Sequence, residues 1–259
     1  MGNSPVLFIG HGAPTFALEP GDLGPLLEEL GARLAGAAAV LVVSPHWQTA
    51  QLRVMASVAP ETIHDFGGLA PELYELDCPA PGHPEFAAQT AQMLIAAGFE
   101  VALDERRGLD HGAGVPLRYL FPRADVPIFQ LSMPYALDPA GAVRLGSALV
   151  PLREHGVVIA GSGSLTHNLG EFRGPVADNA AYVSEFLDWV RRAVLANATA
   201  ELVNYRRLAP RAVRAHPSVE HFLPLLVALG AVGEGEKAQV IDGGICYGML
   251  SMESYVWGD

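Results

Sequence analysis

Runs of apolar, largely β-branched residues recur along the chain, and each is apolar at nearly every position instead of at alternate positions. They are VLFI at 6–9, VLVV at 40–43, PIFQL at 127–131 and VVIA at 157–160. Continuous runs of this kind are typical of strands that are covered on both faces, as in largely parallel sheets. We therefore predict a strand at each run.

Segments with the 3.6-residue periodicity of helices alternate with these runs, at 24–34, 84–97, 140–155 and 180–195. This alternation predicts an α/β fold, a sandwich in which a largely parallel central sheet is flanked by helices on both faces. The proline- and glycine-rich segments at 66–71 and 78–84 are short and read as loops. We expect a single domain over residues 1–259, because nothing in that length forces a second one.

Composition narrows the classes of partner. The formal net charge is −12, and no basic cluster interrupts it, which argues against nucleic acid and anionic membranes as partners. No stretch reaches transmembrane length and the N-terminus has no signal-peptide pattern, so we expect a cytoplasmic protein. Cys78 and Cys246 stand alone and predict neither a zinc ribbon nor a disulfide framework.

Three of the nine histidines follow predicted strands. His11 follows VLFIG, His46 follows VLVVSP, and His167 follows VVIAGSGSLT. A single histidine after a strand is usually a packed loop residue. Three that meet at the carboxyl edge of one sheet, where open α/β folds build their sites, indicate a functional cluster.

Four further histidines have weaker signals. His221 is expected on a helix that begins near Ser218, where it would form an internal hydrogen bond or bind a metal, whereas His216 is expected to be exposed or to cap that helix. His111 precedes an apolar helix and His64 lies in a glycine-bounded loop, so either could line a pocket. The segment GSGSLT fits neither a dinucleotide fingerprint nor a nucleophile elbow, and the H-E-x-x-H zinc-protease motif is absent from the sequence.

Taken together, the sequence blocks resemble the LigB-type (class III) extradiol dioxygenases, and among them the 4,5-DOPA dioxygenase-like subgroup. The resemblance runs nearly end to end through GHGAP at 10–14, VVSPHW at 42–47, TIHDFGG at 62–68, GLDHGAG at 108–114, SGSLTHNL at 162–169, PSVEHF at 217–222 and LSMESY at 250–255. One departure is that Gly114 and Val115 stand where relatives often carry a bulky aromatic, which would widen or reshape the pocket.

The resemblance implies a role for each of the main histidines. It implies that His11, His46 and His221 bind the metal, that His167 and His111 are catalytic acid/base residues, and that His64 contacts the substrate. In some members the residue equivalent to His167 is also counted as a metal ligand.

The implied reaction is extradiol cleavage of a catechol ring by O2 at non-haem iron(II). A face of neutral imidazoles suits that metal and leaves positions for both substrates. Two alternatives stay open: a zinc-dependent hydrolase, because histidine-rich sites accept zinc readily, and a binding protein that has lost the metal. The expected partners are a small catechol and O2, and the sequence leaves open whether the chain forms a homo-oligomer.

Overall fold

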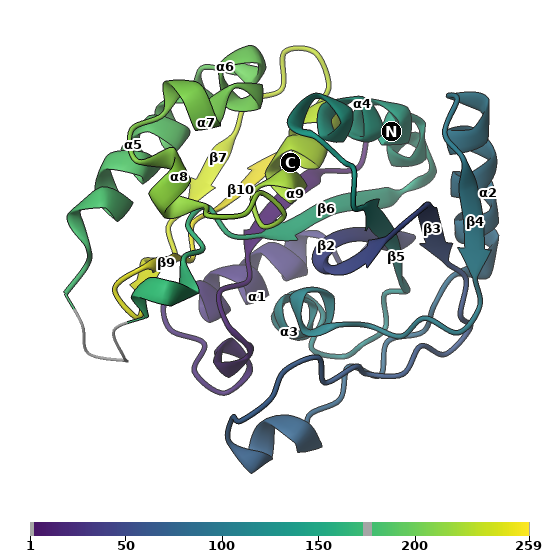
Figure 1. Ribbon diagram of the computed structural model, residues 1–259. Helices are drawn as coiled ribbons and strands as arrows, with labels where there is room; N and C mark the ends of the chain where they lie inside the picture. The colour runs from purple at the N-terminus through teal and green to yellow at the C-terminus, as the bar shows by residue number, and fades with distance from the viewer. Residues whose placement is uncertain (1–2, 173–177, 259) are drawn as a thin grey trace.

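The computed structural model describes residues 3–172 and 178–258. Its centre is an eight-stranded sheet with the order β4-β3-β5-β2-β6-β1-β10-β7 (Figure 1). The strands of this sheet are β1 (Val6–Gly10), β2 (Ala39–Thr49), β3 (Leu52–Met55), β4 (Val101–Asp104), β5 (Ile128–Pro134), β6 (Val157–Gly163), β7 (Gln239–Ile241) and β10 (Ser254–Trp257). Strands β8 (Ile245–Cys246) and β9 (Leu250–Ser251) form a separate two-stranded sheet.

The predicted strands make up the middle of the sheet. Strands β5, β2, β6 and β1 are neighbours and run parallel to one another. The flanking strands were not predicted, and they bring antiparallel pairings: β3 with β5, β10 with β1, and β7 with β10. They are short, at three or four residues each, so their sequences carry little periodic signal.

Helices cover both faces of the sheet, which confirms the predicted class. Helices α1 (Leu23–Arg33) and α3 (His111–Leu120) lie on one face, and α9 (Leu223–Ala231) lies on β1, β2 and β6 on the other, with α4 (Pro139–Leu149) beside it (Figure 1). Helix α2 (Pro84–Ala96) packs against β3, β4 and α4. Helix α5 (Ala181–Leu195) packs with the short helices α6 (Thr199–Val203) and α8 (Ala212–Ala215), and α7 (Tyr205–Leu208) packs against both short helices.

Helix α9 is apolar on all sides because it is buried between the sheet and α4. Its backbone comes close to two glycines: a Cβ on Gly161 of β6 would lie 2.1 Å from the carbonyl oxygen of Pro224, and one on Gly146 of α4 would lie 1.9 Å from that of Val227. Glycine at these positions lets the three elements pack backbone to backbone.

Prolines explain two differences from the predicted helices. The predicted helix at 140–155 ends at Leu149 and continues as a 3-10 helix, Val150–His155, because Pro151 has no amide hydrogen with which to continue the α-helical pattern. The helix expected from Ser218 begins only at Leu223, with Pro224 in its first turn. His221 is therefore in a turn before α9, and the prediction that it lies on the helix was wrong.

Among the described residues, no helix is both long enough and apolar enough to span a bilayer.

Candidate metal centre and pocket

Four histidines meet where the central parallel strands end. His11 directly follows β1, and His167 comes four residues after β6. His46 lies inside β2, where the pairing with β6 has ended and the register with β5 shifts. His221 reaches the same edge because its carbonyl oxygen accepts a hydrogen bond from the backbone N–H of Ser164, just beyond β6 (2.9 Å).

His11, His46 and His221 point their ring nitrogens toward a common centre. One ring nitrogen from each residue lies within 4.8 Å of those of the other two. The Nε2 atoms of His11 and His46 are 3.3 Å apart, and the ring centroid of His221 is 5.7 Å from that of His11 and 5.2 Å from that of His46. His11 is 1 % and His221 6 % exposed, so their nitrogens have little access to bulk water.

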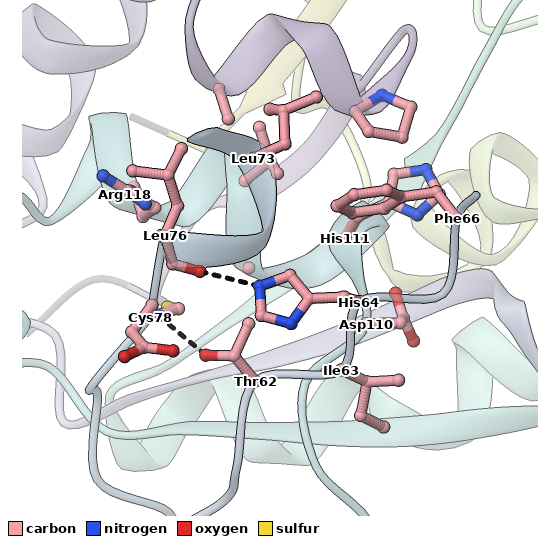
Figure 2. A pocket seen from close by; sticks show the side chains of 15 residues that line it. Thr62, Ile63, His64, Phe66, Leu73, Leu76, Cys78, Asp110, His111 and Arg118 are labelled. Atoms are coloured by element: carbon pink, nitrogen blue, oxygen red, sulfur yellow. Dashed lines mark hydrogen bonds between the residues drawn. The ribbon is translucent and has the colours of Figure 1, made fainter. Parts of the chain in front are cut away.

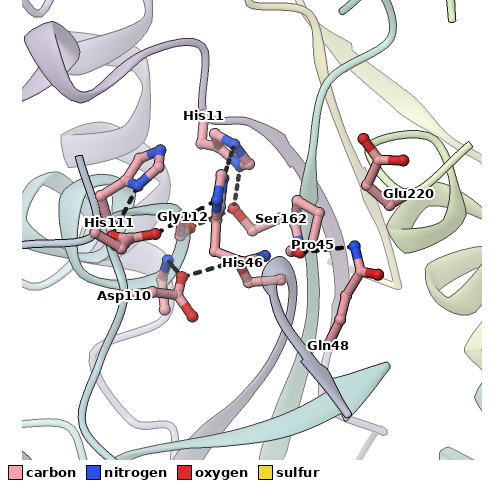
Figure 3. Close-up of polar contacts among 12 residues, drawn as sticks. His11, Pro45, His46, Gln48, Asp110, His111, Gly112, Ser162 and Glu220 are labelled. Atoms are coloured by element: carbon pink, nitrogen blue, oxygen red, sulfur yellow. Dashed lines mark hydrogen bonds and ion pairs between the residues drawn. The ribbon is translucent and has the colours of Figure 1, made fainter. Parts of the chain in front are cut away.

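The outer nitrogen, Nδ1, of each of these rings faces an oxygen. In His11 it is 2.9 Å from Oγ of Ser162, whose own hydrogen is donated to the carbonyl oxygen of Gly112, so His11 must donate from Nδ1 (Figure 3). In His46 it lies 3.4 Å from Oδ2 of Asp65, and in His221 it lies 3.1 Å from Oε1 of Glu220.

The oxygens of Ser162 and Glu220 place the hydrogen of His11 and of His221 on Nδ1 and leave a lone pair on Nε2, whereas the 3.4 Å contact of His46 with Asp65 is an ion-pair distance and not a hydrogen bond. Within the described part of the chain, Nε2 of His221 is buried without a hydrogen-bond partner. Nε2 of His46 lies at hydrogen-bond distance from Nε2 of His11, so without a metal a hydrogen on one of these atoms can join the two rings, and a divalent cation would take its place. Three neutral imidazoles, each with an oxygen facing its Nδ1 atom, are the usual donor set for zinc or iron, so these residues fit a divalent metal.

The pKa values of the three histidines are lowered, which keeps their rings uncharged. Burial, followed by the neighbouring imidazoles, lowers the pKa of His11 and of His221 well below the ordinary value. Burial likewise lowers the pKa of His46 to about 4, although Asp110 and Asp65 oppose this shift. All three rings are therefore neutral at pH 7, which is the state that binds a metal.

His111 is the first residue of α3, and its ring centroid lies 4.0 Å from that of His46. Its backbone N–H and its Nδ1 both donate to Oδ1 of Asp65, over 2.9 and 3.0 Å. Burial opposes the ionisation of Asp65, but the hydrogen bonds and charge of His111 outweigh it and lower the pKa of the carboxyl to about 2. When its ring is neutral, His111 thus carries its hydrogen on Nδ1 and presents Nε2 as an acceptor.

The start of α3 is held by Asp110, which is fully buried and caps the helix. Its carboxylate accepts hydrogen bonds from the side chains of Ser44, Gln130 and Arg107, each over 2.8 Å, and from the backbone N–H of Ala113 over 3.1 Å. This network fixes the position of His111 beside the three-histidine centre.

His167 stacks on His221, with ring centroids 3.5 Å apart and planes 7° from parallel. Burial lowers its pKa, and Glu220 opposes that shift. A neutral, partly exposed imidazole that stacks on His221, a member of the centre, can accept or return a proton.

A pocket opens beside His111 and is shown in Figure 2. Helix α3 contributes Gly114, Val115 and Arg118 to its wall, and the loop after β3 contributes His64 and Phe66. His64 is turned toward the backbone, because its Nε2 donates to the carbonyl oxygen of Leu76 (3.1 Å). The predicted pocket residues His64 and His111 thus share one cavity, whose lining is largely apolar apart from a few polar groups.

Some of the predictions fail or are incomplete. His216 was expected to be exposed or capping, but it is fully buried, with Nε2 donating to the carbonyl oxygen of Leu165 (2.7 Å). The neighbours of His216 in the sequence do not indicate its burial, because the segments that cover it come from elsewhere in the chain. The acceptors Ser162, Asp65 and Glu220 were not predicted as site residues, since polar residues near a histidine carry no sequence signal until the fold brings them into contact.

Comparisons with known proteins place the chain in a family. Residues 23–256 match the family described as the catalytic LigB subunit of aromatic ring-opening dioxygenase. The chain is 40% identical over 255 residues to a 4,5-DOPA dioxygenase extradiol of Beta vulgaris, covering 96% of this chain and 94% of that one. It is 36% identical over 256 residues to the protein of the same name from Escherichia coli (strain K12), covering 96% and 93%.

A solved structure of an uncharacterized Escherichia coli K12 protein, JW3007, superposes with a TM-score of 0.79 at 29% identity and covers 98% of this chain and 99% of that one. The family match and these relatives extend over most of the chain, and the residues of the family match include His46, His111, His167 and His221 but not His11. The chain therefore belongs to the LigB family and is an extradiol, aromatic ring-opening dioxygenase.

Proposed function

We propose that this enzyme uses iron(II), held by His11, His46 and His221, to cleave a catechol beside its two hydroxyl groups with O2. The observation that supports this most directly is the convergence of three imidazoles whose Nδ1 atoms each face an oxygen, which turns their Nε2 atoms toward one centre. The chemistry that iron(II) supplies in such a site is activation of O2 and acidification of a chelated hydroxyl.

The chain's own residues would bind the ring and manage protons. The apolar wall formed by Val115 and Phe66 suits an aromatic ring, and His111 lines the same pocket. His167, on the other side of the centre, is a second neutral base. We propose that the two imidazoles take up the protons of the catechol hydroxyls and return one as the ring opens, and that His64 helps to shape the substrate end of the pocket.

The names of the relatives make DOPA the first substrate to test. Protein loaded anaerobically with iron(II) is mixed with O2 and DOPA, protocatechuate or homoprotocatechuate, while O2 uptake and visible absorbance are recorded together. We expect a coloured semialdehyde and consumption of one O2 per ring. A colourless diacid, which forms by cleavage between the hydroxyls, would contradict the proposed reaction.

Alanine variants separate the metal centre from the proton-transfer residues. His11→Ala, His46→Ala and His221→Ala should each lose the metal. His167→Ala should keep it and lose about a hundredfold to ten-thousandfold in kcat, the usual contribution of a general acid/base. His155→Ala, at an exposed position outside the site, is the control. Full metal occupancy in the first three variants would refute the ligand assignment.

Zinc is the second candidate for the metal, because three histidines also form a common zinc site. Zinc-loaded protein that hydrolysed an ester or amide without O2 uptake would contradict the proposed reaction.

A further inference from the structure

A single carboxylate links the candidate metal centre to the pocket. Oδ1 of Asp65 accepts hydrogen bonds from the backbone N–H and Nδ1 of His111, and Oδ2 lies 3.4 Å from Nδ1 of His46. Resting on the function proposed above, we propose that Asp65 is a positioning residue that holds the metal ligand His46 and the acid/base His111 in their working tautomers.

The positions of the hydrogens on the two imidazole rings support this role. An ionised carboxylate has no hydrogen to donate, so a ring nitrogen that approaches it must donate. Asp65 therefore requires hydrogen on Nδ1 of His111, and its charge favours hydrogen on Nδ1 of His46 over the alternative in which His46 donates from Nε2 to Nε2 of His11 at 3.3 Å. In both rings Nε2 then becomes an acceptor. Nε2 of His46 faces the three-histidine centre, and His111 lines the pocket. One side chain thus prepares a ligand for the metal and a base for the substrate.

The position of Asp65 in the chain extends the link to the substrate. It stands between His64 and Phe66, which both line the pocket, and it is hydrogen-bonded to the first residue of α3. If a bound aromatic ring moved this loop, Asp65 would therefore shift relative to Nδ1 of His46. Metal-binding histidines are commonly oriented by an outer carboxylate, whose loss weakens metal binding by about tenfold to a hundredfold.

The fold does not need the Asp65 carboxylate as an anchor for helix α3. The N-terminus of α3 is already capped by the fully buried Asp110, which has four hydrogen-bond donors around it. The Asp65 side chain, by contrast, is 21 % exposed. Replacing it should leave the helix in place.

Two replacements of Asp65 distinguish positioning from packing. In Asp65→Asn the remaining oxygen can still accept from His111, so the new NH2 group faces Nδ1 of His46. That nitrogen must then accept, and the hydrogen of His46 moves to Nε2, the atom needed for the metal. Asp65→Ala removes the acceptor but adds no opposing donor, so water can replace it. Asp65→Asn, although nearly isosteric, should therefore weaken metal binding more than Asp65→Ala does.

The experiment measures zinc affinity by chelator competition, and histidine tautomers by long-range 1H–15N NMR of the metal-free, 15N-histidine-labelled protein. We expect Asp65→Asn to weaken zinc binding about tenfold to a hundredfold, Asp65→Ala to weaken it less, and His46 to switch from Nδ1–H to Nε2–H only in Asp65→Asn. The matched control is Asp138→Asn, which makes the same change at the N-cap of α4, remote from the site.

Three results would overturn the inference: unchanged zinc affinity in Asp65→Asn, an unchanged His46 tautomer in that variant, or a larger loss in Asp65→Ala than in Asp65→Asn. The last would indicate a packing role. Because the tautomers are read without metal or substrate, this outcome is independent of whether the enzyme turns over a catechol, and inactivity of the iron-loaded wild type would count against the proposed function alone.

Discussion

Acid should destabilise the metal-free protein in a window that is set by its buried histidines, and His216 provides the clearest probe. It is fully buried, ringed by Phe186, Tyr205 and Phe222, and its Nδ1 has no hydrogen-bond partner within the described residues. Burial lowers its pKa to about 4 from an ordinary value of 6.5.

The sign follows from the proton balance. Between pH 6.5 and about 4 the unfolded chain binds a proton at His216 that the folded chain does not, so the free energy of unfolding falls as the pH falls. A gap of about 2.5 pKa units at about 1.36 kcal/mol each amounts to about 3 kcal/mol. Asp65, with its pKa lowered to about 2, contributes stability above pH 3.8 that is lost only below that value, outside this window.

The assay is urea unfolding from pH 7 to pH 4.5 in the presence of EDTA, for wild type and His216→Gln. The glutamine Nε2 can still donate to the carbonyl oxygen of Leu165, but it does not titrate. We expect the variant to lose less stability on acidification, with a slope shallower by up to about 1.4 kcal/mol per pH unit. The exposed His155→Ala variant should follow the wild type. Parallel curves for wild type and His216→Gln would refute the reasoning.

Further predictions concern packing and a buried ion pair, and urea unfolding at pH 7 checks each of them. Gly31→Ala should destabilise the fold by about 1–3 kcal/mol, because its Cβ would lie 1.8 Å from the carbonyl oxygen of Leu120 where α1 meets α3. Gly114→Ala should be neutral or stabilising by up to about 1 kcal/mol, since its nearest contact is at 3.4 Å and alanine favours a helix; equal losses in the two variants would contradict this account. Arg153→Ala should cost about 3–5 kcal/mol, because the fully buried guanidinium forms two hydrogen bonds with Glu236, over 2.9 and 2.6 Å, and a loss below 1 kcal/mol would show that the pair does not stabilise the fold.

The pattern of residues along the chain is enough to predict the class of fold and the candidate histidines. Burial on both faces requires strands that are apolar throughout, so the four central strands are visible in the pattern of residues, as are the helices that cover them. His11 and His167 follow two of these strands, and parallel strands end at a common edge, which is why their proximity was predictable. The family blocks added His221, whose own neighbourhood in the sequence is ambiguous between core and site.

The way in which those histidines are held depends on contacts between segments that are far apart in the sequence. Ser162, Asp65 and Glu220 reach them from β6, from the loop after β3 and from the turn before α9, and these contacts depend on how separate segments pack in space. The tautomer of an imidazole is set by the atom that faces its other nitrogen, which no periodicity records. The same reason explains His216: its surroundings come from α5, α7 and the end of β6, so its burial is a property of the folded chain and not of its neighbours in sequence.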